Sequence, residues 1–386
     1  MNSVFLKRNH HKRLLQGHLW IFSNELIDVP KYQAGEIVEV FYENQSFGYS
    51  FFNPNSLISC RMLKSNNSNI EELLIERISK AKSIREILLH SNNYRLIYGE
   101  SDFLPGLIID KYEEYFVVQI LSYGFEVRKD DIKNALLEVF PKTKGIIHRA
   151  NSKLREIEGL PDTDEVLFGK IPESINIDDN GIKLSVNMSS GQKTGYFLDQ
   201  VQNRHFLRKI SNNKSVLDCY CNIGGFGLNA LKGGASEVTF VDVSDSAIHN
   251  TKVNLKLNNY ENYNLFAKDV FDFLPELISK GNKYDIVVLD PPAFAKSKKS
   301  IYAAESGYAK LNKLGIKLLT KNGYLITSSC SHYIGEAKFI EIVSKELAKS
   351  GRKARLIHRA GHSPDHPIHP SMPETEYLKF LVFFVE

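Results

Sequence analysis

Residues 215–234 decide the fold of this chain, and they read S-V-L-D-C-Y-C-N-I-G-G-F-G-L-N-A-L-K-G-G. The apolar start predicts a short buried strand that ends at Asp218, and the stretch from Phe226 onward predicts a helix. Glycines between them allow a ligand to approach the backbone closely, and a helix N-terminus presents free N–H groups. The pattern is typical of a nucleotide-type cofactor site, in which Asp218 can accept a hydrogen bond from a charged amine.

The length and composition of the chain are those of an ordinary globular protein. Its 386 residues, 42% of them apolar, suggest about two or three domains. The net charge of +4 is compatible with nucleic acid but does not require it. Four cysteines are too few for a disulfide framework, so we expect a reducing compartment, the cytoplasm. No apolar run reaches the roughly 18 residues of a membrane helix, and we expect no membrane partner.

Residues 1–68 are predicted to form a small all-β barrel. Segments rich in Val, Ile, Phe and Tyr, at 36–41, 46–51 and 57–63, are separated by Gly, Asn and Pro. A basic cluster stands near Trp20, a combination that suits RNA phosphates and bases but also a solvated basic face. Its members are Lys7, Arg8, Lys12 and Arg13. The basic N-terminus would also suit a transit peptide, but its strand-like runs favour a folded segment.

Residues 69–181 are predicted to form a compact α+β domain. Apolar residues at helical spacing predict helices at 70–90 and 130–140. Strands are expected at 107–109, 115–121, 145–148 and 165–168. We find no reactive constellation here, and Asp110, Glu113 and Glu114 are interpreted as turn and surface carboxylates.

From residue 182 to residue 386, strands alternate with helices, which predicts a doubly wound parallel sheet and an α/β fold class. The expected strands are 216–218, 238–242, 264–267, 286–290, 324–328, 354–358 and 377–385. The expected helices are 225–231, 247–258, 271–280, 302–319 and 335–350.

The glycine turn allows two cofactors. Residues 225–230 match G-x-G-x-x-A, the pattern of an NAD(P)-dependent oxidoreductase. However, five residues separate Asp218 from Gly224, which gives a wider loop than a pyrophosphate needs. Acidic residues also end four successive strands, although each could instead be a helix N-cap: Asp218, Asp242, Asp269 and Asp290. These acceptors suit the amine, diol and sulfonium of S-adenosylmethionine, which has no phosphate.

Two further motifs end the fourth and fifth strands: L-D-P-P-A-F at 289–294 and T-S-S-C-S-H at 327–332. Both open onto the ligand crevice of such a sheet. Cytosine C5 is a weak nucleophile, so its methylation needs a prior addition at C6, for which a thiolate is well suited. Cys330 is placed for that role and Asp290 for the N3/N4 edge of the base. The alternative for Cys330 is a small buried apolar residue.

Other reaction classes remain open at this point. Enzymes that methylate amines usually place an aromatic residue directly after Asp-Pro-Pro, where this chain has Ala293, with Phe294 one position later. A non-catalytic RNA-binding assembly factor on the same fold is a further alternative. Either would leave Cys330 without a catalytic role.

At these motifs the chain resembles the bacterial 23S rRNA (cytosine-5)-methyltransferases. That family combines a PUA domain, a central α+β domain and a Rossmann-like class I methyltransferase domain. The resemblance covers nearly the whole chain. It includes G-H-L-W-I-F at 17–22, G-Q-K-T-G-Y-F-L-D-Q at 191–200, V-D-V-S at 241–244, D-H-P-I-H-P at 365–370 and E-Y-L-K at 376–379.

The resemblance implies S-adenosylmethionine as cofactor, ribosomal RNA as partner and Cys330 as nucleophile. It implies Asp242 at the ribose, Asp269 near the adenine and Asp290 between cofactor and base. The remaining cofactor residues would be Phe197, Asp199 and Gln200 at the methionine end, with Asp218, Asn222, Gly224 and Gly225 in the turn. Many relatives are dimers, so a homodimer is allowed. The guanine-N7 branch shares Asp-Pro-Pro but is not expected to carry Ser-Cys-Ser.

One departure separates the chain from the two-cysteine RNA enzymes. Ala293 and Phe294 leave no second thiol after Asp-Pro-Pro, so the base that removes the C5 proton is unassigned, and Cys219 and Cys221 are interpreted as packing residues. Lys296 and Lys298 follow this turn and suit RNA phosphates or a solvated loop. The spacing of His362, His366 and His369 could bind a metal, but the prolines between them favour a structured loop, and we expect no metal.

Overall fold

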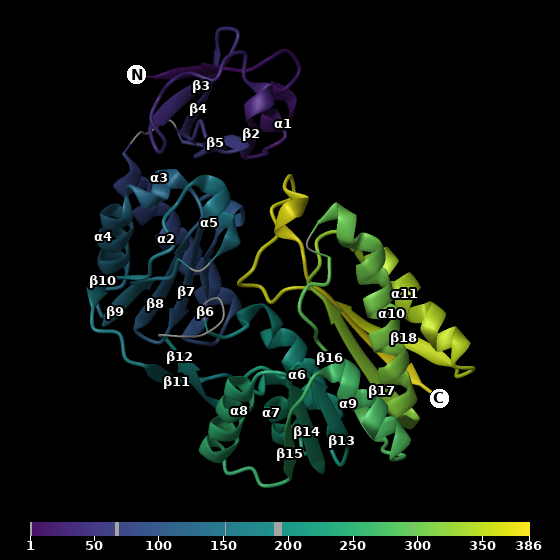
Figure 1. Cartoon of the computed structure of the whole chain (residues 1–386). Coiled ribbons are helices and arrows are strands. Elements are labelled where there is room, and N and C mark those ends of the chain that lie inside the picture. The colour runs from purple at the N-terminus through teal and green to yellow at the C-terminus, as the bar shows by residue number, and fades with distance from the viewer. Residues whose placement is uncertain (1, 66–68, 151, 189–194, 296) are drawn as a thin grey trace. The chain divides into compact units, whose positions relative to one another are not determined.

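The computed structural model of the chain describes residues 2–65, 69–150, 152–188, 195–295 and 297–386. It divides into two compact units (Figure 1). The first unit comprises Met1–Ile177, Val186–Leu198 and Pro364–Thr375, and the second comprises Asp178–Ser185, Asp199–Ser363 and Glu376–Glu386. Among the described residues, no helix has the length and apolar character needed to span a bilayer.

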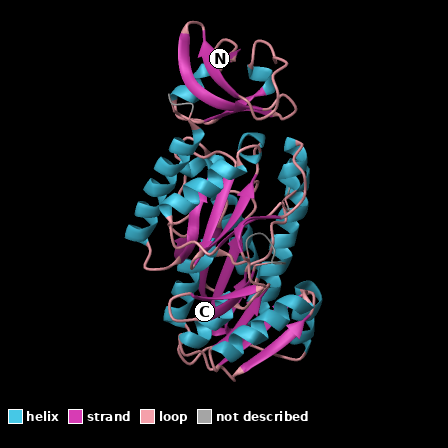
Figure 2. Cartoon of the chain, turned by 90° about the vertical axis from the view of Figure 1, so that its left-hand side faces the viewer, coloured by secondary structure: helices cyan, strands magenta, loops and turns pink. Residues whose placement is uncertain are grey.

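The first unit begins with a curved five-stranded sheet (Figure 2) of order β1-β3-β4-β5-β2. Its strands are β1 Ser3–Phe5, β2 Trp20–Phe22, β3 Ile37–Tyr42, β4 Gln45–Phe52 and β5 Ile58–Met62. The three predicted strands are confirmed, but the prediction of an all-β segment is wrong. A short helix, α1 His11–Leu15, lies in the basic stretch and buries Leu14. Five residues are too few to produce a helical period in the sequence.

A second five-stranded sheet of the first unit has the order β10-β9-β8-β7-β6. Its strands are β6 Asn93–Tyr98, β7 Leu107–Tyr112, β8 Tyr115–Ile120, β9 Gly145–His148 and β10 Glu165–Gly169. The helices around it are α2 Ile70–Leu88, α3 Tyr123–Glu126, α4 Lys129–Val139 and α5 Lys153–Glu158. Buried side chains of α2 and α4 share one apolar cluster with the sheet, as the helical spacing of the two predicted helices requires.

The predicted turn carboxylates of this sheet divide into two kinds. Glu113 and Glu114 lie at the turn between β7 and β8 as expected. Asp110 does not: it is fully buried in β7 and accepts two hydrogen bonds from Arg95, at 2.7 and 2.8 Å. A buried carboxylate needs such a partner, and only the tertiary fold supplies it.

A buried polar cluster joins the N-terminal sheet to α5. Glu158 is 4% exposed and its Oε1 accepts from Arg61 Nη2 and Ser56 Oγ, both at 2.6 Å. Asn53 Nδ2 donates to its Oε2 at 3.1 Å. Arg61 has a second, longer ion pair with Glu100 at 3.7 Å, and Asn53 Nδ2 also donates to Glu158 O at 3.1 Å. Loss of the Glu158 carboxylate would nevertheless remove the short bonds from Arg61 and Ser56 in a place that water does not reach.

The second unit contains a seven-stranded sheet of order β15-β14-β13-β16-β17-β19-β18. Its strands are β13 Ser215–Cys219, β14 Glu237–Asp242, β15 Tyr263–Ala267, β16 Tyr284–Leu289, β17 Leu319–Ser329, β18 Ala354–Ala360 and β19 Lys379–Val385. Strands β13 to β17 are parallel, and β19 pairs antiparallel with both β17 and β18. The order reverses between β13 and β16, which creates the crevice that binds ligands in doubly wound folds.

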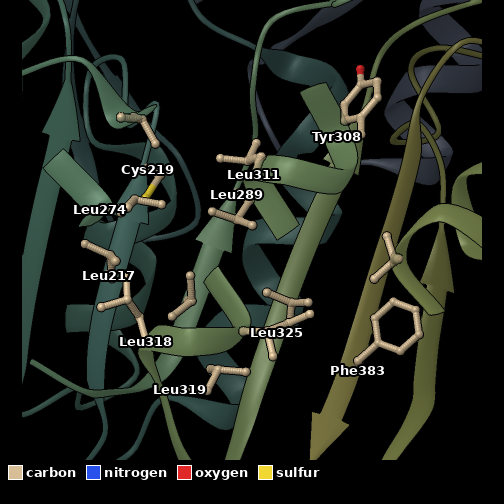
Figure 3. Close-up of a cluster of buried hydrophobic side chains, with 14 of the residues drawn as sticks. Leu217, Cys219, Leu274, Leu289, Tyr308, Leu311, Leu318, Leu319, Leu325 and Phe383 are labelled. Atoms are coloured by element: carbon tan, nitrogen blue, oxygen red, sulfur yellow. The ribbon is translucent and has the colours of Figure 1, made fainter. Parts of the chain in front are cut away.

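Helices cover this sheet: α6 Val201–Ile210, α7 Gly225–Lys232, α8 Asp245–Leu257, α9 Val270–Ser279, α10 Ile301–Leu318 and α11 Glu336–Lys349. Helices α9, α10 and α11 pack on the strands around a large apolar cluster, to which Leu217, Leu289 and Leu311 belong (Figure 3). The predicted α/β class and its helix–strand alternation are confirmed. The prediction omitted α6 and the small two-stranded sheet of β11 Ser174–Asp178 and β12 Lys183–Asn187.

Candidate active site

The turn between β13 and α7 is a rigid backbone cradle. Gly224, the residue before the helix, has a φ of +88°, and Asn222 also adopts a left-handed conformation, which costs free energy in a residue other than glycine. Neighbouring elements hold the turn. Thr251 Oγ1 donates to Asn222 O at 2.9 Å, and Asn254 Nδ2 donates to Ile223 O at 3.0 Å. The cradle is thus shaped by the protein itself.

Gly227 has a packing role, which explains the apparent dinucleotide pattern. A Cβ on this residue would lie 2.1 Å from the ring of Phe240 in β14. Only glycine therefore lets α7 lie so close to the sheet. The second glycine of G-x-G-x-x-A follows from helix–sheet contact and needs no pyrophosphate.

Asp218 is a fully buried carboxyl at the end of β13. Its Oδ2 accepts from Gly227 N at 2.8 Å, but its Oδ1 has no hydrogen-bond partner among the described residues. Burial raises the pKa of Asp218 to about 8, and the nearby Asp290 and Asp242 carboxylates add to this rise. A buried oxygen without a partner is costly, so this atom is suited to receive a donor from a cationic ligand.

The carboxyls at the next two strand ends have different local partners. Asp242 is half-buried and accepts from Asn222 N and Ser244 N, each at 3.0 Å, so it fixes the cradle. Asp269 is exposed and is the N-cap of α9, accepting from Phe271 N at 2.7 Å. The N-cap alternative therefore applies to Asp269, whereas Ser244 is the N-cap that follows Asp242.

Asp290 follows β16 and faces residues that precede α6. Its Oδ1 accepts from Gln200 Nε2 at 3.0 Å, and Gln200 Oε1 accepts from Asn203 Nδ2 at 2.6 Å. Burial raises the pKa of Asp290 to about 7, and the Asp199 carboxylate contributes to the rise. Asp199 is itself buried and accepts a hydrogen bond from Tyr377 OH. Asp290 is therefore positioned as a carboxyl that can hold a proton near neutral pH.

Cys330 directly follows β17 and lies beside the Asp-Pro-Pro turn. Its Sγ is 4.0 Å from Pro291 O. Cys330 is half-buried, whereas Cys60, Cys219 and Cys221 are buried, and burial raises the pKa of each of these three thiols, that of Cys60 to about 12. The structure thus brings the two predicted catalytic residues together and leaves one accessible thiol.

A hydroxyl network holds the Cys330 loop, and its central residue, Tyr308, was not predicted from the sequence. Tyr308 of α10 is fully buried; Ser329 Oγ donates to its OH at 3.0 Å, and Ser331 Oγ lies 2.9 Å from the same OH. Ala295 N also donates to Ser331 Oγ, at 3.2 Å. Tyr308 therefore fixes the residues on both sides of Cys330.

Phe294 is held within the protein. Its ring lies 4.6 Å from that of Tyr308, at 37°, and it packs against the apolar cluster of the second unit. A Cβ on Gly307 would lie 3.0 Å from the Phe294 ring. The aromatic ring after Asp-Pro-Pro is thus engaged in packing, which disfavours a role in stacking on a base.

The predicted RNA-binding residues lie in different environments. Arg13 donates to both carboxylate oxygens of Glu25, at 2.6 and 2.7 Å, and Trp20 Nε1 donates to Glu100 at 2.8 Å. Arg8, Lys12 and Lys298 are exposed, as is Lys7, whose Nζ donates to Asn24 O at 3.0 Å. Lys296 lies outside the described residues. Phe197 belongs to the first unit.

The three histidines whose spacing could have bound a metal each lie within hydrogen-bond distance of a nearby residue. His362 Nε2 accepts from Tyr377 N and Leu378 N, at 3.2 and 3.0 Å. His366 Nδ1 lies 2.9 Å from Asp365 Oδ1, and His369 Nδ1 accepts from Ser371 N at 3.2 Å. Within the described ranges, no three His, Cys, Asp or Glu side chains form a group that could hold a metal ion.

The raised pKa of Asp290 predicts a specific dependence of stability on pH. Its protonated form is favoured in the folded state, so this stabilisation is present below about pH 4 and is lost as pH rises through about 7. We expect the free energy of unfolding of Asp290→Asn, relative to that of the wild type, to increase by about 2–3 kcal/mol from pH 5 to pH 8. Denaturant unfolding at both pH values measures this difference. The exposed Asp272→Asn is the control, and a difference that does not grow with pH would contradict the prediction.

The fold and the site together define a class of protein. A doubly wound sheet places a glycine cradle, four carboxyls and a thiol at the carboxyl ends of its parallel strands, and the unpaired Asp218 Oδ1 fits the amine of S-adenosylmethionine. This is the arrangement of a Rossmann-like methyltransferase. A family profile of S-adenosylmethionine-dependent methyltransferases matches residues 156–383, and a PUA-like domain profile matches residues 4–65.

Two relatives match nearly the whole chain. Ribosomal RNA large subunit methyltransferase I of Tolumonas auensis is 38% identical over 391 residues, covering 98% of both chains. The protein of the same name from Aliivibrio fischeri is 37% identical over 387 residues, again with 98% of both chains covered. The chain therefore belongs to the S-adenosylmethionine-dependent methyltransferases, in the family of the ribosomal RNA large subunit methyltransferases I.

Solved structures show the same fold. A candidate methyltransferase in complex with S-adenosylhomocysteine has a TM-score of 0.86 at 23% identity, and a candidate S-adenosylmethionine-dependent methyltransferase from Streptococcus mutans has 0.85 at 23%. Both matches cover 100% of each chain. The cofactor is S-adenosylmethionine, as the sequence predicted, and the dinucleotide alternative is excluded by the family match.

Proposed function

We propose that the protein methylates C5 of a cytosine in large-subunit ribosomal RNA. The observation that carries the proposal is the accessible Cys330 thiol, 4.0 Å from Pro291 O at the Asp-Pro-Pro turn. The names of the relatives support the RNA substrate, and a substrate of that kind locates the protein in the cytoplasm. The engaged ring of Phe294 counts against methylation of an amine.

In the proposed reaction, Cys330 activates the base by addition. The Cys330 thiolate forms an S–C bond to C6, the C5=C6 electrons shift through the ring, and N3 takes a proton from the Asp290 carboxyl. S-Adenosylmethionine, when bound, would supply the electrophilic methyl group to C5; the S–CH3 bond breaks, and the sulfur keeps the electron pair in S-adenosylhomocysteine. A base then removes the C5 proton, the double bond re-forms, and the thiolate leaves C6 while N3 returns its proton to Asp290.

The environment of Asp290 supports its part in this scheme. A carboxyl whose pKa is raised to about 7 by burial and by Asp199 is protonated in a large fraction of molecules at neutral pH. It can then donate to N3, which a fully ionised carboxylate cannot do. The hydrogen bond from Gln200 Nε2 at 3.0 Å holds the carboxyl in one orientation.

The cofactor is proposed to lie along the strand ends of the second unit. Asp218 Oδ1 would accept from the amine, Asp242 from the ribose and Asp269 from the adenine. The backbone of the turn would line the ligand at Asn222, Gly224 and Gly225, and the methionine end would meet Asp199 and Gln200.

The ribose assignment gives a testable prediction. We expect Asp242→Ala to weaken binding of S-adenosylhomocysteine by about 10- to 100-fold, because it removes a charge-assisted hydrogen bond and frees the cradle residues Asn222 and Ser244. Isothermal titration calorimetry measures the change. The exposed Asp245→Ala is the matched control, and equal affinity in the two variants would count against Asp242.

Exposed basic residues are proposed to contact the RNA backbone. Among the described residues these are Lys7, Arg8 and Lys12 in the PUA-like segment and Lys298 after the Asp-Pro-Pro turn, all exposed. Lys296, which lies outside the described residues, is included in the proposal from its place in the sequence alone. Arg13 and Trp20 would contribute less than the others, because Glu25 and Glu100 already engage them. Phosphate contacts of this kind make RNA affinity fall as salt increases.

The identity of the product tests the proposed function. Purified protein is incubated with large-subunit ribosomal RNA and S-adenosylmethionine carrying a deuterated methyl group, and the RNA is digested to nucleosides for mass spectrometry. We expect the label in 5-methylcytidine alone. Label in 7-methylguanosine or in an N-methylated nucleoside would overturn the proposal, and absence of label from an enzyme that binds S-adenosylhomocysteine would favour a non-catalytic RNA-binding role.

A further inference from the structure

Lys379 is a buried lysine next to the Cys330 loop. It is the first residue of β19 and pairs in register with Ser329, the last residue of β17. Its side chain is 6% exposed, and its Nζ donates to Ser331 O and to Tyr377 O, both at 2.7 Å. The ammonium group is thus anchored to the backbone of the residue that directly follows Cys330.

The charge of Lys379 has no carboxylate partner. Among the described residues, no Asp or Glu oxygen lies within 4.0 Å of its Nζ, in contrast to the ion pairs of most other buried cations in the chain. Carbonyl oxygens satisfy two of its donors but carry no net charge. An ammonium group held in this way stabilises a negative charge that forms nearby.

We propose that Lys379 is a positioning residue that stabilises the thiolate form of Cys330 by its charge while it fixes the Ser331 carbonyl. The proposal rests on the proposed function, in which Cys330 is the nucleophile. It assigns a role to the lysine of E-Y-L-K, and that role is electrostatic, beyond the packing of β19 against β17.

The charged groups around the pair are consistent with this role. Burial lowers the pKa of Lys379 to about 8, while Cys330, Glu376 and Glu336 act in the opposite direction. The Cys330 loop also contacts the buried Tyr308 of α10 through Ser329 and Ser331, and the thiol lies 4.0 Å from Pro291 O of the Asp-Pro-Pro turn. Burial raises the pKa of Tyr308. Tyr308 is therefore neutral at neutral pH, whereas Lys379 carries a positive charge next to the Cys330 loop.

The reactivity of the thiol tests the proposal without RNA or cofactor. The Cys330 thiolate displaces iodide from iodoacetamide, forming one S–C bond while iodide leaves with its electron pair, and the neutral thiol does not react. Because Cys60, Cys219 and Cys221 are buried, peptide mass spectrometry follows Cys330 selectively. The alkylation rate is measured from pH 5.5 to pH 10 for the wild type and for Lys379→Gln, which keeps N–H donors but loses the charge.

We expect Lys379→Gln to move the midpoint of the rate profile upward by about one to two pH units, as loss of a nearby opposite charge predicts. Lys379→Arg should stay close to the wild type. Tyr308→Phe, which loosens the same loop but keeps the ammonium group, should leave the midpoint in place. If Lys379→Gln does not unfold cooperatively, Lys379→Met takes its place.

An unchanged midpoint in Lys379→Gln, or an equal shift in Tyr308→Phe, would overturn the proposal. Lys379 would then serve only to hold the backbone through its hydrogen bonds. A midpoint shift combined with label on another nucleoside would instead retain the electrostatic role and reject Cys330 as the methylation nucleophile. The two failures are therefore distinguishable.

Discussion

Replacing Cys330 by alanine is expected to abolish formation of 5-methylcytidine while cofactor binding persists. In the proposed mechanism the thiol supplies the covalent step that makes C5 nucleophilic, so its loss should lower the rate by on the order of 10³-fold or more, as for other removed nucleophiles. The side chain lies in a loop held by Tyr308, Ser329 and Ser331, and none of these bonds uses the sulfur. The change should therefore be confined to the chemistry.

Two measurements accompany this variant. Transfer of a labelled methyl group to ribosomal RNA gives the rate, and calorimetry with S-adenosylhomocysteine gives the affinity, which should change less than about twofold. Cys219→Ala is a matched control because its thiol is buried in the same unit. Wild-type levels of 5-methylcytidine from Cys330→Ala would rule out the covalent mechanism.

Replacing Glu158 by alanine is expected to destabilise the first unit by about 3–5 kcal/mol, the cost of removing one partner from a buried ion pair. Arg61 would remain buried without its 2.6 Å partner, and Ser56 and Asn53 would lose hydrogen bonds as well. Single substitutions that lower the stability by about 2 kcal/mol already change protein abundance, and this loss would be larger.

The chain contains a fluorescent probe for the unfolding of the first unit. Trp20 is its single tryptophan, and it lies in β2, next to the strand that carries Arg61. Denaturant unfolding followed by its fluorescence therefore reports on the first unit. Glu156→Ala, an exposed change in the same helix, is the control and should stay within about 0.5 kcal/mol of the wild type. Equal midpoints for the two variants would show that the Glu158 cluster contributes no stability.

Much of the second unit follows from local sequence. The apolar run before Asp218 and the glycines after it predict a strand, a turn and a helix, and the same alternation predicts the strands that end near Asp242, Asp269 and Asp290. Each signal spans about ten residues, because the periods of strands and helices are local properties. The positions of the acidic residues and of Cys330 then follow from the rule that parallel strands end on one edge.

The errors have a common physical cause. The helix α1 is too short to show a period, and the strand β6 carries Arg95, a polar residue that pairs with the buried Asp110. Asp110 was expected at the surface because a carboxylate alone favours water. Its partner comes from a neighbouring strand, 15 residues away in sequence, and pairing between strands leaves no mark in either segment.

The sequence by itself determined the α/β class, the cofactor cradle and the residue types of the chemistry, because these depend on periods and motifs within short segments. The tertiary structure decided which of these residues lie together and how far each is buried. It placed Cys330 next to Pro291, tied the residues beside it to Tyr308 and Lys379, and brought the half-buried Asp290 close to Asp199. Burial and Coulomb interactions between distant segments set the protonation of these groups, and such interactions exist only once the chain has folded.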